Sequence, residues 1–238
     1  MIIKQIPNAI TSANLFTGCI GIVFAFNQDL RSAALCILIS LFIDFFDGFA
    51  ARLLKVSGPM GKELDSLADM VSFGVLPSVI LFHMAPKSFF GYEAFPILSY
   101  LAFFVAVFSA YRLAKFNLDT RQTDKFIGVP TPAISAVIAS VPFIYESDVF
   151  YFDSSTTTVL LYLAFIPLVC YLLVSEITLI ALKFKSFGFA ENKFRYILII
   201  ASILLLVIFK FVAIPLILVL YIVLSIIENR TTKVKAVS

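Results

Sequence analysis

The chain has 238 residues, of which 61% are hydrophobic, and its mean hydropathy is +1.02. Soluble domains contain about 45–50% apolar residues, so this composition excludes an ordinary soluble protein. The net charge is only +3, and no basic face interleaved with aromatic residues indicates nucleic-acid binding. We therefore expect an all-α, polytopic membrane helix bundle that forms a single transmembrane domain over residues 1–238.

Eight apolar segments are predicted to be membrane helices, because each approaches the roughly 20 residues that a crossing requires. In chain order they cover residues 9–26, 31–54, 61–85, 94–117, 129–149, 157–182, 194–209 and 211–228. Only Lys210 and Pro215 interrupt the last apolar run, so one overlong, kinked helix is the alternative there. The N-terminal segment lacks an obvious A-x-A cleavage site and is interpreted as retained rather than as a signal peptide.

The distribution of basic residues predicts the orientation of these helices. If both termini lie on one side of the membrane, 15 of the 18 Lys and Arg residues fall on that side, at the termini, in loops or at helix ends. The three exceptions are Arg31, Lys87 and Lys210. Cytoplasmic segments accumulate basic residues. We therefore expect both termini to be cytoplasmic, in a multi-pass protein of the cell inner membrane.

Cysteine and histidine offer little material for a catalytic or metal site. Cys19, Cys36 and Cys170 are dispersed in apolar segments, without the close pairing of a zinc or redox motif. His83 is the single histidine and ends an apolar run, so no Ser-His-Asp triad is convincing.

Four aspartates lie in the second and third predicted membrane helices. Asp44 and Asp47 are three residues apart and Asp65 and Asp69 four apart, so each pair occupies one helical face. The turn between the helices contains Gly58 followed by Pro59, which predicts an antiparallel hairpin with the carboxylates at similar depth. Such close carboxylates repel one another unless a cation lies among them. Oxygen ligands favour hard cations such as Mg²⁺, Mn²⁺ or Ca²⁺, and four carboxylates suffice for two ions that clamp phosphate oxygens.

Small residues and one arginine accompany the aspartates. Gly48, Ala51 and Gly61 would let a bulky ligand approach, although small residues also simply allow close helix packing in membranes. Arg52 adds a planar guanidinium suited to phosphate.

Together these residues spell D-x2-D-G-x2-A-R-x8-G-x3-D-x3-D, from Asp44 to Asp69. The pattern resembles the signature of the CDP-alcohol phosphotransferase family, without a departure. The resemblance implies a six-helix catalytic core, here residues 1–182, a homodimer and an active site open to the cytoplasm. Residues 183–238 would then be additional C-terminal helices.

Within that family, the chain is similar to the membrane-embedded members that transfer the phosphatidyl group of CDP-diacylglycerol to L-serine and release CMP. The similar segments are residues 6–8, 66–74, 112–117 and 128–132, together with Thr11, Asn14, Leu15 and Pro77. Lys115 and Val129 depart from the pattern, since other members often have Arg and Leu there.

The resemblance also implies roles for individual residues. The metal ligands would be Asp44, Asp47, Asp65 and Asp69, which would hold two Mg²⁺ or Mn²⁺ ions. Asp69 would also be the catalytic base for the serine hydroxyl.

The two substrates would contact further residues. The nucleotide-binding residues would be Asn8, Thr11, Gly48, Ala51, Arg52 and Gly61. Serine carries a carboxylate, for which the fork of Arg112 is suited, and Lys115 and Asn117 would assist.

Other functions remain open at this point. A different acceptor, such as glycerol 3-phosphate or inositol phosphate, would demand more cations near the site. A divalent-cation transporter would place carboxylates near the midplane with exits to both sides. A structural scaffold would leave four buried acids unexplained.

Overall fold

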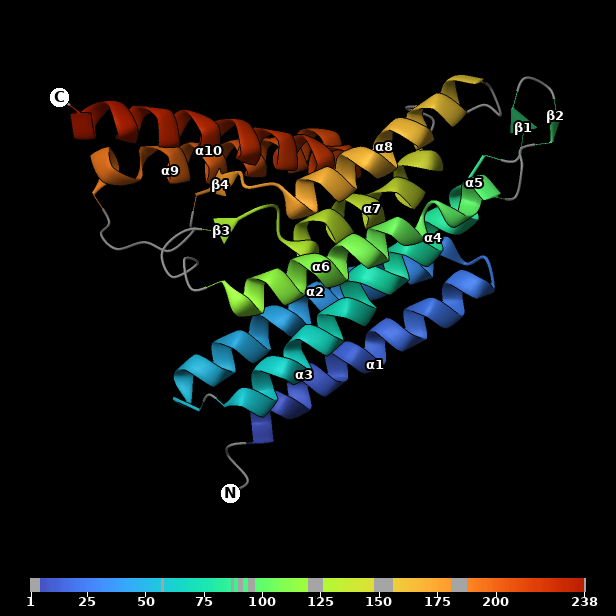
Figure 1. Ribbon diagram of the computed structural model, residues 1–238, viewed down its shortest axis with the longest axis horizontal. Helices are drawn as coiled ribbons and strands as arrows, with labels where there is room; N and C mark the ends of the chain where they lie inside the picture. The colour runs from blue at the N-terminus through green and yellow to red at the C-terminus, as the bar shows by residue number, and fades with distance from the viewer. Residues whose placement is uncertain are drawn as a thin grey trace.

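Long helices dominate the computed structural model, which describes residues 5–56, 58–86, 88–89, 92–93, 97–119, 126–147, 156–180 and 188–237 (Figure 1). The helices are α1 (Ile6–Phe26), α2 (Leu30–Leu53), α3 (Pro59–Asp69), α4 (Leu76–Met84), α5 (Ile97–Tyr100), α6 (Phe103–Leu118), α7 (Thr131–Tyr145), α8 (Thr156–Val174), α9 (Phe189–Phe209) and α10 (Ala213–Val237), with a π-helix η2 (Met70–Val75) and a 3-10 helix η3 (Lys210–Val212). Two antiparallel pairs of two-residue strands are β1 (Ser88–Phe89) with β2 (Tyr92–Glu93), and β3 (Phe126–Ile127) with β4 (Thr178–Leu179). The expected all-α bundle is confirmed.

Six helical stretches in the described part of the chain are long and apolar enough to cross a bilayer. They are Ile6–Phe26, Leu30–Leu53, Pro59–Met84, Ile97–Leu118, Thr156–Val174 and Asn192–Thr231. The 15 residues of α7 are fewer than the roughly 20 of a full crossing. This helix is shorter than the predicted 129–149: it begins at Thr131, with Pro132 in its first turn, and Glu146 already lies in a turn. Residues 148–149 lie outside the described ones.

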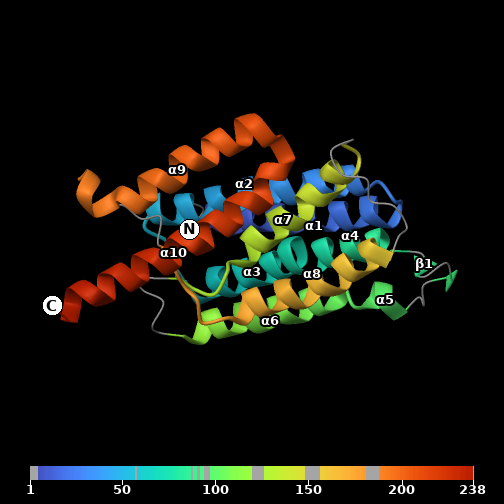
Figure 2. The same ribbon diagram turned by 90° about the horizontal axis from the view of Figure 1, so that it is seen from above.

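The C-terminal stretch is a helical hairpin rather than one kinked helix. Lys210 has a left-handed φ of 49°, which ends α9, and η3 reverses the chain into α10. Figure 2 shows α9 and α10 joined at this turn, beside the other helices. The prediction of two separate C-terminal helices therefore holds.

The third apolar segment is helical throughout but changes its hydrogen-bond pattern. Between α3 and α4 the six residues of η2 form a π-helix, a wider turn that α-helices adopt locally. Pro77, in the first turn of α4, has no N–H to donate back to the carbonyl of Phe73, which removes one α-helical hydrogen bond there. Asp69 lies directly at the start of this wide turn.

Helix α1 packs closely against α2, α3 and η2 because small residues face them. A Cβ at Gly18 would collide with the Ser72 hydroxyl, so only glycine allows this approach. The Ser72 hydroxyl donates to the backbone oxygen of Asn14 at 3.1 Å, which joins η2 to α1. The buried core beside this contact includes Ile37, Phe73, Leu76, Ile80, Ile134 and Leu173.

The segment predicted as helix over 157–182 is wrong at its end. Helix α8 stops at Val174, and Thr178 and Leu179 instead form β4, paired with β3. The backbone N–H of Gly128 donates to Ile177 at 2.9 Å, which satisfies a carbonyl that the helix no longer uses. Residues 181–182 lie outside the described ones.

Both chain ends, the α2–α3 turn and the β3–β4 pair lie toward one end of the molecule, and β1 and β2 lie at the other (Figure 1).

Candidate active site

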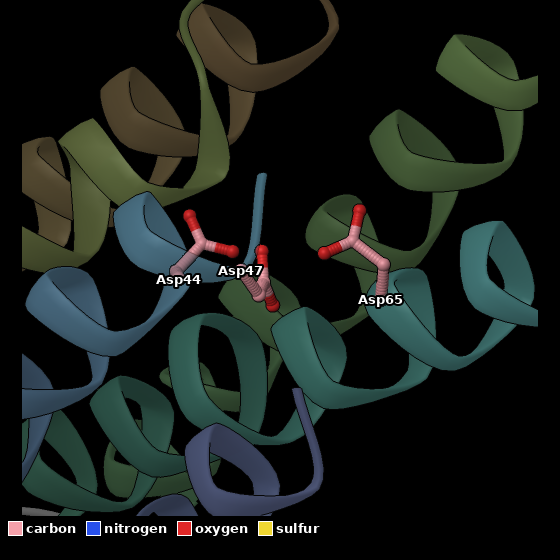
Figure 3. A group of neighbouring side chains, drawn as sticks. All are labelled: Asp44, Asp47 and Asp65. Carbon is pink, nitrogen blue, oxygen red and sulfur yellow. The ribbon is translucent and has the colours of Figure 1, made fainter. Parts of the chain in front are cut away.

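The α2–α3 hairpin brings three of the predicted aspartates together. Asp44, Asp47 and Asp65 each offer a carboxylate oxygen, and these atoms all lie within 4.8 Å of one another. Figure 3 shows the side chains converging, two from α2 and one from α3. Asp47 is 6% exposed, and the other two are partly buried. The spacing predicted from helical periodicity thus produces a real cluster.

Asp69 lies beside this cluster rather than within its closest group. It is 9% exposed, and its carboxyl group lies close enough to that of Asp44 for the two groups to interact. Its Oδ1 is buried and has no hydrogen-bond partner among the described residues. This oxygen of Asp69 is therefore left for a further ligand.

The charge of the four aspartates is poorly balanced by the protein. In the described ranges, none of the four forms a salt bridge with Lys or Arg. The guanidinium of Arg112 is near enough to Asp69 for their charges to interact. Closely spaced carboxylates removed from water are costly without a compensating cation. The oxygen-only donors of the cluster fit a hard divalent cation such as Mg²⁺ or Mn²⁺.

Helix α1 contributes a direct contact to the cluster. The hydroxyl of buried Thr11 is 2.8 Å from Asp47 Oδ2 and 3.0 Å from the backbone oxygen of Pro7. A hydroxyl has one hydrogen to donate, and the charged, nearer acceptor is the stronger partner. Thr11, expected from the resemblance to bind the nucleotide, therefore also orients a metal-ligand candidate.

The other predicted nucleotide-binding residues lie around the end of the hairpin that carries the α2–α3 turn. A Cβ at Gly61 would lie 3.2 Å from Asn8 Oδ1, so glycine there lets α1 and α3 approach closely. The exposed Arg52 donates from Nε to the backbone oxygen of Gly48 at 2.9 Å. Ala51, in the last turns of α2, is partly buried.

Arg112 is the predicted acceptor-binding residue that faces the aspartates. It is 8% exposed, its Nη1 lies 3.5 Å from Thr131 Oγ1, and its guanidinium carbon is 5.4 Å from the centre of the Phe116 ring. Its buried Nε has no partner among the described residues. A buried cation with a free donor beside Asp69 suits a carboxylate ligand.

Lys115 and Asn117 lie on the same helix as Arg112, α6, but contact residues outside this helix. Lys115 forms a salt bridge of 3.3 Å with Glu176, and both side chains are well exposed. Asn117 donates from Nδ2 to the Ser66 hydroxyl at 2.9 Å and accepts from Lys62 at its backbone oxygen, which ties α6 to α3. Their roles toward serine stay predictions.

Sequence reasoning did not find two partners of these residues. Thr131 contacts Arg112, and Glu176 contacts Lys115. Thr131 lies in the segment 128–132, which is similar to the family pattern, and this similarity is the available signal for it. Glu176 lies just after α8, in a region without a recognised motif.

Comparisons with known proteins place the chain in a family. The profile of the CDP-alcohol phosphatidyltransferase family matches residues 4–227. A CDP-diacylglycerol–serine O-phosphatidyltransferase of Helicobacter pylori is 34% identical over 173 residues, which cover 72% of this chain and 70% of the relative. Enzymes of the same name from Bacillus subtilis and Saccharomyces cerevisiae are each 36% identical, over 60% and 56% of this chain and 78% and 52% of the relatives, respectively.

Proposed function

Because this chain belongs to the CDP-alcohol phosphatidyltransferase family, and is an integral membrane enzyme of it, we propose that it transfers the phosphatidyl group of CDP-diacylglycerol to L-serine. The products would be phosphatidylserine and CMP. The observation that carries the proposal is the convergence of Asp44, Asp47 and Asp65 beside Asp69 and the buried Arg112. The names of the relatives in three species support serine as the acceptor.

The four aspartates would hold two divalent ions, Mg²⁺ or Mn²⁺. When bound, such ions neutralise the negative charge of a diphosphate and of the departing CMP. The carboxylates from α2 and α3 would fix where the diphosphate lies, because the hairpin brings Asp44, Asp47 and Asp65 close together. Thr11 would keep Asp47 oriented for this task.

Asp69 would act as the general base. Its unpartnered Oδ1 is available to accept the proton of the serine hydroxyl. The hydroxyl oxygen would form a new bond to the phosphorus that carries diacylglycerol. The bond from that phosphorus to the CMP oxygen would break, and CMP would leave with the electron pair.

The surrounding residues would orient the two substrates. Arg52 would contact the diphosphate, and the small surfaces of Gly48, Ala51 and Gly61 would leave room for the nucleotide beside Asn8. Arg112 would pair with the carboxylate of serine, a charge-assisted and bidentate interaction. Lys115 and Asn117 would complete the acceptor side.

We also propose the cellular arrangement implied by the sequence. Both termini and the site would face the cytoplasm of a cell with this protein in its inner membrane, because basic residues concentrate at that end. Residues 1–182 would be the catalytic core of a homodimer, and residues 183–238 an addition to it.

Release of CMP by the purified protein tests this proposal. The protein would be incubated with CDP-diacylglycerol, Mn²⁺ or Mg²⁺, and one alcohol at a time. We expect release that depends on serine and is abolished in Asp69→Asn. Asp29→Asn is a matched control, because Asp29 is an exposed cap at the opposite end of α2.

Two results would contradict the proposal. Release with glycerol 3-phosphate or inositol phosphate, but none with serine, would exclude serine as the acceptor. Uptake of the metal into liposomes without any lipid product would instead favour a cation transporter.

A further inference from the structure

A row of three polar side chains on α10 faces β4. Tyr221, Ser225 and Asn229 are spaced by four residues, which places them on one helical face. We call them the α10 polar row. They form three hydrogen bonds with the backbone of β4 and the residue after it: Tyr221 Oη donates to Ile180 O at 2.7 Å, Ile180 N donates to Ser225 Oγ at 3.1 Å, and Asn229 Nδ2 donates to Thr178 O at 2.6 Å.

These bonds determine the position of an otherwise short strand. Two-residue strands have little stability of their own, so neighbouring elements must hold them. Ser225 is fully buried and Ile180 is 2% exposed. The backbone N–H and C=O groups of Ile180 are therefore removed from water and need their hydrogen-bond partners. Helix α10 thus replaces the sheet that β4 lacks on that side.

Strand β4 in turn holds the chain that leads into α7. Ile127 of β3 is the register partner of Thr178. The next residue, Gly128, has φ +77° and donates to Ile177 O, and a Cβ there would lie 2.9 Å from Ser175 O. This close contact with the segment after α8 fixes the position of the start of α7.

Both ends of this connection reach the acceptor side of the site. Thr131, at the start of α7, lies 3.5 Å from Arg112 Nη1. Glu176, between α8 and β4, pairs with Lys115 at 3.3 Å. The two cationic residues assigned to serine are therefore each contacted by a residue whose backbone depends on the β3–β4 pair.

We propose that α10 is a positioning element for the acceptor side of the active site: the α10 polar row fixes β4, and through β3 it fixes Thr131 against Arg112 and Glu176 against Lys115. This inference rests on the proposed function, and it gives the C-terminal hairpin a role in catalysis. In this role the three residues of the row do not need to touch a substrate. They act through the residues that β4 positions.

Steady-state kinetics of two variants in the full chain test the proposal. Asn229→Leu removes one donor at similar size, and Tyr221→Phe removes only the hydroxyl and keeps the ring in place. We expect the KM for serine to rise roughly three- to ten-fold in each, the range expected for one lost hydrogen bond. The KM for CDP-diacylglycerol should not change. Thr231→Val is the control, because among the described residues the exposed Thr231 hydroxyl bonds only to carbonyls of its own helix, α10.

The outcomes separate this inference from the proposed function. Unchanged serine KM in both variants, or equal losses for both substrates, would overturn the positioning role. If Asn229→Leu does not fold, Tyr221→Phe alone decides. If the wild-type protein releases no CMP with serine, the proposed function fails. The KM values of the variants are then compared for the alcohol that the wild-type protein does use.

Discussion

The hydrogen bond between Thr11 and Asp47 predicts how strongly the site depends on α1. The bond is 2.8 Å long, and both residues are buried. Thr11→Val keeps the shape of the side chain but removes the donor. A hydrogen bond to a charged group contributes about 1.5–3 kcal/mol, and loss of the partner of a metal ligand typically costs about 10- to 100-fold in metal affinity or activity. We therefore expect the Mn²⁺ concentration that gives half-maximal CMP release to rise by about 10- to 100-fold.

The assay is a Mn²⁺ titration of CMP release at saturating CDP-diacylglycerol and serine. Thr11→Ser should restore most of the affinity, because it keeps the hydroxyl. Thr17→Val is the matched control on α1, since the Thr17 hydroxyl bonds to Ala13 O of its own helix. A normal Mn²⁺ dependence together with a raised KM for CDP-diacylglycerol would refute this reasoning, and would identify Thr11 as a nucleotide ligand only.

Three further predictions concern metal dependence and stability. Removing divalent metal with a chelator should abolish CMP release and lower the Tm. Metal restored to about 100 times its Kd should return about 2.7 kcal/mol of stability. Full activity in excess chelator would contradict the metal site. Gly128→Ala should lower the Tm by about 2–8 °C, because its φ of +77° disfavours a Cβ, whereas Gly58→Ala, with open space around it, should not. Arg31→Met breaks the 3.0 Å salt bridge to Glu146, but both side chains are more than half exposed, so we expect a loss of at most about 1 kcal/mol in thermal unfolding and normal CMP release.

Hydropathy and helical periodicity predicted most of the fold. The bounds of α1 and α2 differ from the predicted segments by only a few residues, because long apolar helices have a strong periodic signal. The π-helix η2 was not predicted. A widened turn depends on how Gly74 packs and on the missing donor of Pro77, and neither changes the hydropathy pattern.

The cluster of aspartates was predictable because its geometry is local. Spacings of three and four residues, on two helices joined by a short turn, are sufficient to bring Asp44, Asp47 and Asp65 together. The contacts that support the cluster are not local. Thr11 is 36 residues from Asp47, and Arg112 is 43 residues from Asp69 in the numbering, so both depend on how whole helices dock.

The wrong end of α8 has the same origin as the inferred role of α10. The apolar residues after Val174 are compatible with either a helix or a strand, and periodicity cannot separate the two in a short run. Their extended conformation is favoured by partners distant in sequence: Ile127 of β3, and Asn229 and Tyr221 of α10. A segment whose conformation depends on such contacts transmits changes in them. We therefore expect the acceptor side of the site, which this segment supports, to be more sensitive to α10 than the aspartates of the locally determined hairpin.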